Sequence, residues 1–126
     1  EAQLLENEIL SKTEIYNDYV AFGVVMTDQL NKYNVEISDI DSVINTFRDT
    51  DKIKISVLIK QQTENEYKVS FRSKGNIDVG LIAKNLGGGG HKNAAATRIT
   101  GNFETVSNKI KEEIHVYFSR NNVLVS

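Results

Sequence analysis

Four consecutive glycines, Gly87–Gly90, constrain the fold of this chain more than any other feature. Glycine has no Cβ and accepts positive φ, so a run of glycines lets the backbone turn sharply and approach other groups closely. A flexible linker would lie among serine, proline and polar residues. This run instead lies between Leu86 and the apolar segment 94–96. It is therefore predicted to end a helix inside a folded domain.

The residues that follow the glycines are suited to binding an anion. Backbone N–H groups of a glycine-rich turn can converge on a phosphate, and His91, Lys92 and Asn93 would add side-chain donors beside them. A helical turn after the glycines would point its N-terminus at the same anion. The run is neither a Walker loop nor a dinucleotide-binding fingerprint, because Lys92 follows too closely and a helix leads into it.

Arg72 is a second candidate phosphate ligand. It alternates with the apolar residues Tyr67, Val69 and Phe71, so it lies on the polar face of a predicted strand. A guanidinium can bind a phosphate through two parallel hydrogen bonds. Taken alone, Arg72 is better explained as an ordinary exposed arginine; its position before the glycine run is what favours a binding role.

Charge is distributed unevenly along the chain. Residues 1–51 hold three basic and eleven acidic side chains, whereas residues 52–98 hold nine basic and three acidic ones. A basic middle third within an acidic chain is typical of a local anion-binding face. Lysines that solvate the edges of strands would give the same distribution.

The hydrophobic pattern predicts one compact domain of the α/β class (α+β mixed), a mixed β-sheet covered by helices. Helices are expected over 2–19, from Thr27 to Asn34, over 38–47, from Asp78 to the glycines, and from Thr105, with Val106, Ile110, Ile114 and Tyr117 inward. Strands are expected over 20–26, 53–59 (half-buried), 67–72 in a hairpin with it, and 94–99.

Several classes of protein are excluded by composition. The chain has no cysteine, which excludes disulfides, zinc ribbons, iron–sulfur ligation and a thiol nucleophile. Its longest apolar run is 20–26, too short to span a membrane, and no signal peptide is expected. We therefore expect a cytoplasmic origin and no membrane partner.

Three segments together resemble a known family. Arg72–Gly75, Asp78-Val79 and Gly87–Ala95 are similar to the motifs of the DHH-associated C-terminal domain of DHH phosphoesterases, over about residues 20–115. The nanoRNase and phosphoadenosine-phosphate phosphatase branch, which includes bacterial oligoribonucleases, is the most similar. One departure is Ala96, where many relatives have glycine.

The resemblance implies a division of labour between two domains. A separate N-terminal DHH domain would hold two manganese ions through Asp and His ligands, and residues 1–19 would be a linker helix from it. Residues 20–126 would be the substrate-binding domain, with short RNA or a nucleotide phosphate as its partner. The implied substrate-binding residues are Arg72, Ser73, Gly87, Gly88, Gly89, Gly90, His91, Lys92 and Asn93, with Ser73 and Asn93 the weaker candidates.

No catalytic or metal-binding residue is assigned to this chain. Two-metal hydrolysis needs several carboxylates and imidazoles that converge on the ions, and the chain has only two histidines and no Asp-His-His run. The expected protein is a manganese-dependent hydrolase of which this chain supplies substrate positioning and should be inactive alone. A cyclic di-AMP phosphodiesterase domain is one alternative, and a non-enzymatic RNA-binding module of the KH type, whose Gly-x-x-Gly loop Gly87–Gly90 matches, is another.

Overall fold

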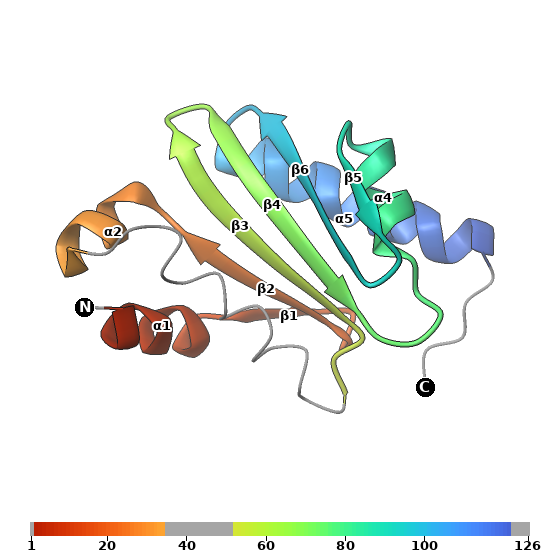
Figure 1. The fold of residues 1–126 in the computed structure, drawn as a ribbon, viewed down its shortest axis with the longest axis horizontal. Helices are drawn as coiled ribbons and strands as arrows, with labels where there is room; N and C mark the ends of the chain where they lie inside the picture. The colour runs from red at the N-terminus through yellow and green to blue at the C-terminus, as the bar shows by residue number, and fades with distance from the viewer. Residues whose placement is uncertain (1, 35–51, 122–126) are drawn as a thin grey trace.

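The protein, seen in a computed structural model, is described over residues 2–34 and 52–121, where helices pack on both faces of one sheet (Figure 1). The strands lie in the order β1-β2-β3-β4-β6-β5. β2 and β3 are parallel and all other neighbours are antiparallel, which confirms the predicted mixed sheet. The helix expected over 38–47 lies outside the described residues. The strands are β1 (Glu14–Tyr16), β2 (Val20–Val25), β3 (Ile55–Thr63), β4 (Glu66–Ser73), β5 (Gly89–His91) and β6 (Ala94–Thr100).

Two helices, α4 (Val79–Asn85) and α5 (Phe103–Asn121), cover one face of the sheet. Alternate strand residues such as Val57, Val69 and Phe71 point at them and are fully buried, because successive side chains of a strand face opposite sides. The predicted stripe of α5 is confirmed: Val106, Ile110, Ile114 and Tyr117 are its buried residues. Each such aliphatic or aromatic side chain stabilises the fold by roughly 1.5–3 kcal/mol.

Among the described residues, α1 (Ala2–Ser11) and α2 (Thr27–Tyr33) cover part of the other face. These helices lie over β2 and β3, where a second apolar cluster forms. Its buried members are Leu5, Ile9, Ala21, Val25, Ile53 and Leu58. The residues of β4, β6 and β5 on this face lie outside that cluster, and several of them line the groove described below.

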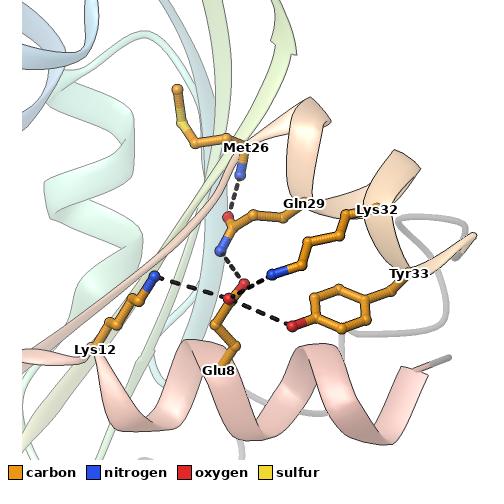
Figure 2. Close-up of polar contacts among 6 residues, drawn as sticks. All are labelled: Glu8, Lys12, Met26, Gln29, Lys32 and Tyr33. Carbon is orange, nitrogen blue, oxygen red and sulfur yellow. Dashed lines mark hydrogen bonds and ion pairs between the residues drawn. The ribbon is translucent and has the colours of Figure 1, made fainter.

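A network around one carboxylate joins α1 to α2 (Figure 2). Glu8 accepts a hydrogen bond of 2.9 Å from the Gln29 side chain and weaker ones from Lys32 and Tyr33. Gln29 in turn accepts one of 2.8 Å from the backbone N–H of Met26. The Gln29 hydrogen bond, opposed by burial and assisted by the charges of Lys32 and Lys12, lowers the pKa of Glu8 below its ordinary value.

The prediction of a single helix over 2–19 is wrong. α1 ends at Ser11, and β1 follows and pairs with β2 in an antiparallel hairpin. Asn17 and Asp18 have φ values of 54° and 68° in its turn. Asparagine and aspartate adopt this left-handed conformation more readily than other non-glycine residues, so their pair was the signal for a turn.

The prediction that β3 is half-buried is also wrong. Besides the expected apolar set, Ser56, Leu58 and Lys60 are buried, because this central strand has neighbours on both edges and α1 lies over part of its second face. The final helix begins earlier than expected. The N–H of Thr105 donates to the Asn102 side chain, so Asn102 rather than Thr105 caps α5.

Candidate phosphate-binding groove

An open groove of about 350 Å³ lies on the face of the sheet opposite α5. Its walls and floor come from β3, β4, β5 and β6. The lining residues are Lys60, Lys68, Ser70, Arg72, Gly89, Gly90, Ala94, Ala95 and Ala96. Of these described residues, three are cations, none is acidic and the others are small, so the described side chains make the groove electropositive.

Arg72 and His91 belong to one transverse row of the sheet. Ala94 of β6 is in register with Arg72 of β4 on one side and with His91 of β5 on the other. Directly paired residues present their side chains on the same face. Two strand spacings separate the Arg72 and His91 backbones, about 10 Å. The side chains of Arg72 and His91 are both long enough to approach one anion placed above Ala94. The sheet therefore brings the two predicted ligands together.

The next row of the groove has almost no side-chain bulk. Ser70, Ala96 and Gly89 are paired across β4, β6 and β5. A Cβ added at Gly89 would meet nothing within 4 Å, so this glycine is not required by packing. The absence of a side chain there keeps the floor of the groove open to a ligand.

The other three glycines have structural reasons for being glycine. Gly87 has a φ of +90°, and its N–H donates to Lys84 while that of Gly88 donates to Ala83, a pattern that closes the C-terminus of α4. A Cβ at Gly88 would collide with the carbonyl oxygen of Ala96, and one at Gly90 would lie 2.5 Å from the Ala95 Cα. A helical turn after the glycines, which would have pointed its N-terminus at the anion, is not formed, because the edge strand β5 already begins at Gly89.

Ser73 and Asn93 bind each other rather than the groove. The buried Ser73 hydroxyl donates to the carbonyl oxygen of Ile77 at 2.6 Å and accepts from the Asn93 side chain at 3.0 Å. The Lys92 ammonium donates to the Asn76 side chain at 3.0 Å. These contacts fasten the β5–β6 hairpin tip to the loop after β4, next to Arg72.

The structure therefore divides the predicted site residues. Arg72, Gly89 and Gly90 line the groove, and His91 lies in the row of Arg72. Gly87 and Gly88 close the C-terminus of α4. The others, Ser73, Lys92 and Asn93, make the contacts that fasten the hairpin tip. Sequence reasoning missed Lys60, Lys68 and Ser70, which share the polar alternation of Arg72 along two paired strands; that alternation was the available signal.

The groove does not fit a manganese ion. Its charged side chains are ammonium and guanidinium groups, whereas Mn²⁺ prefers carboxylate, carbonyl and water oxygens. Within 2–34 and 52–121, no three His, Cys, Asp or Glu side chains are grouped to hold a metal. The ion that the family resemblance implies is therefore not assigned to residues of this groove.

A comparison with known families decides the assignment of the chain. The profile of the DHHA1 domain matches residues 17–116. The chain belongs to the DHHA1 domain family. This confirms the DHH-associated domain expected from the three motifs, and the matched region contains the whole groove.

Individual relatives agree with that family. The chain is 31% identical over 97 residues to the bifunctional oligoribonuclease and PAP phosphatase NrnA of Thermus thermophilus, covering 73% of this chain and 30% of NrnA. It is 26% identical over 115 residues to the membrane protein–large ribosomal subunit bL9 fusion protein of Onion yellows phytoplasma, covering 90% of this chain and 13% of the relative.

A solved structure shows the same fold. The exopolyphosphatase-related protein from Bacteroides fragilis superposes with a TM-score of 0.85 at 24% identity, covering 92% of this chain and 34% of that one. The chain thus spans about a third or less of these relatives. In the described part of the chain, no helix is long and apolar enough to cross a membrane.

Proposed function

We propose that this chain is the substrate-binding domain of a two-domain phosphoesterase, and that its groove binds a phosphate of a nucleotide or short RNA. One observation carries the proposal: Arg72, Lys60 and Lys68 line a single groove, and none of the described residues that line it is acidic. Cationic side chains around small residues offer charge-assisted hydrogen bonds to phosphate while leaving room for a sugar. The similarity to NrnA, named as an oligoribonuclease and PAP phosphatase, supports the same class of substrate.

The hydrolytic metals belong, in this proposal, to a separate DHH domain for which residues 1–19 act as the connection. A manganese ion there would supply a metal-activated hydroxide. The residues of this chain hold the substrate phosphate, orient it and screen its charge. The chain alone is therefore expected to bind the substrate but not to hydrolyse it.

The test is direct binding of the 5′-phosphorylated dinucleotide pApA to this chain, by calorimetry, against the same dinucleotide without its 5′-phosphate. The phosphorylated form is expected to bind more tightly, and Arg72→Ala to weaken it ten- to a hundredfold, the value of a charge-assisted hydrogen bond. Equal affinity for the two forms, unchanged by Arg72→Ala, would overturn the proposal. Hydrolysis by this chain with Mn²⁺ would overturn the assignment of the metals to another domain.

The two alternatives differ in what they require. A KH module needs a helix on each side of its Gly-x-x-Gly loop, and here a strand, β5, begins within the run at Gly89, which argues against it. A cyclic di-AMP phosphodiesterase domain would bind cyclic di-AMP in preference to pApA. Competition between these two ligands for the groove distinguishes it from the nanoRNase branch.

A further inference from the structure

The first turn of α4 lies directly against the backbone of β5, on the face of the sheet opposite the groove. A Cβ added at Gly80 would lie 3.0 Å from the carbonyl oxygen of His91 and 3.3 Å from that of Gly90. An ordinary contact of a Cβ atom is 3.4 Å or longer. Glycine at this position therefore lets the helix approach the strand more closely than any other residue would.

The stability of the helix does not account for this glycine. Gly80 is the second residue of α4, and within a helix glycine is less favourable than alanine. An alanine Cβ would also lie 2.9 Å from Oδ1 of Asp78, the oxygen that accepts the capping N–H of Leu81. Weakening of this cap and the gain in helix propensity are similar in size and opposite in sign. The close approach to β5 is what remains to explain Gly80.

The first turn of α4 is held more firmly than the strand that it touches. The N–H of Asp78 donates to the Tyr117 hydroxyl of α5 at 2.8 Å, which fixes the start of α4 to the longest helix described. β5 is a three-residue strand at the end of the sheet, paired with β6. One side of β5 faces α4, and the open groove lies on the other. A side chain at residue 80 would therefore displace β5 toward the groove.

We propose that Gly80 is a positioning residue for His91. By leaving no side chain between α4 and β5, it sets the depth of β5 in the sheet, and with it the place of the exposed His91 imidazole in the row of Arg72. This inference rests on the proposed function, because it takes a phosphate above Ala94 as the group that His91 reaches. Gly80 acts from the opposite face. A shift of a few tenths of an ångström in β5 would weaken the hydrogen bond of His91, which depends on distance and angle.

The experiment follows the two histidines of the chain by NMR as pApA is added. In the unaltered chain, the imidazole Cε1–H resonance of His91 should move on binding, whereas that of His115, exposed on α5, should not. In Gly80→Ala, the movement of the His91 resonance should shrink, and calorimetry should show pApA binding weakened about three- to tenfold. Leu81→Ala is the matched control, because it places the same residue at the next position of the turn, where the side chain is 46% exposed; it should change neither result.

A double variant separates positioning of His91 from a general effect on the groove. In a His91→Ala background, Gly80→Ala should cost no further affinity for pApA, because it acts through the missing imidazole. Equal losses in the two backgrounds would overturn the inference. The melting temperature of Gly80→Ala should lie within about 4 °C of that of the unaltered chain. A variant that no longer folds would show that Gly80 serves the fold itself, and would also overturn the inference.

The outcomes distinguish this inference from the proposed function. If pApA does not bind the unaltered chain, the proposed function fails. If pApA binds but the His91 resonance does not move, or moves equally in Gly80→Ala, the positioning role is wrong and the proposed function stands.

Discussion

Arg72 and His91 are in register with the same residue, Ala94, from opposite sides of β6. They are far apart in sequence and on strands that are not neighbours, yet one row of the sheet aligns them. A single phosphate above Ala94 would lie between a guanidinium and an imidazole. This alignment gives the first prediction.

Arg72→Ala and His91→Ala, made in the full-length protein that contains this domain, should each reduce kcat/KM for pApA by about ten- to a hundredfold. The double variant should lose less than the product of the two, because both side chains contact one phosphate. A loss in KM alone indicates uniform binding, and a loss in kcat as well indicates alignment of the scissile phosphate. Steady-state kinetics on the four proteins measures this. Losses that multiply would show that the two residues act on separate groups.

Glycines within the run should differ in their tolerance of alanine. Gly89→Ala should preserve or raise the free energy of unfolding, by up to about 1 kcal/mol, because its Cβ has open space and the unfolded chain loses entropy. It should nonetheless weaken pApA binding, since the added methyl group shares the face of Ala96. Gly88→Ala should destabilise the fold through its collision with the Ala96 carbonyl.

Urea unfolding and calorimetric binding test both glycine variants. A stable Gly89→Ala chain with unchanged affinity would mean that the ligand does not occupy the centre of the groove.

Ser73→Ala should act on stability more than on affinity. The change removes a donor to the Ile77 carbonyl and an acceptor for Asn93, in a buried position, at a cost of about 1–3 kcal/mol. Measured at a temperature where the variant is folded, pApA affinity should stay within about twofold, because the hydroxyl is used inside the hairpin tip. A tenfold loss of affinity at unchanged stability would instead make Ser73 a ligand.

Glu8→Gln should reduce stability at neutral pH and have no effect in acid. The hydrogen bond from Gln29 lowers the pKa of Glu8 below 4.5, so the folded state favours the carboxylate. A lowered pKa contributes stability above the unfolded-state pKa, and this contribution is lost as the pH falls through the folded-state pKa. The difference between the two proteins in urea unfolding should therefore shrink as the pH falls below the unfolded-state pKa of Glu8 and vanish below its lowered folded-state pKa. A difference that is independent of pH would contradict this origin.

Sequence patterns predicted the elements whose signal is local. The inward stripe of α5 and the alternation of β4 follow from helical and strand periodicity and were correct. β5 was missed because Gly89 and Gly90 carry no side chains to alternate. The burial of Lys60 and its pairing with Lys68 depend on which strands become neighbours, which residue types alone do not specify. The glycine and arginine motifs could be predicted from the sequence, but the alignment of Lys60 with Lys68 could be seen only once the register of the strands was known.

The one parallel pair of the sheet has a consequence for the order in which the domain assembles. β3 joins β4, and β5 joins β6, through short hairpin connections, whereas β2 reaches β3 only through the long segment between Val25 and Ile55. Closing a longer loop costs more entropy, and parallel pairing cannot use a tight turn. Two of the strands that carry the groove, β3 and β4, therefore meet through local contacts, while the α1–β1–β2–α2 half docks through distant ones. Early in folding, the β3–β4 hairpin can therefore be formed while Leu58 of β3, which later packs with apolar residues of α1 and α2, is still exposed.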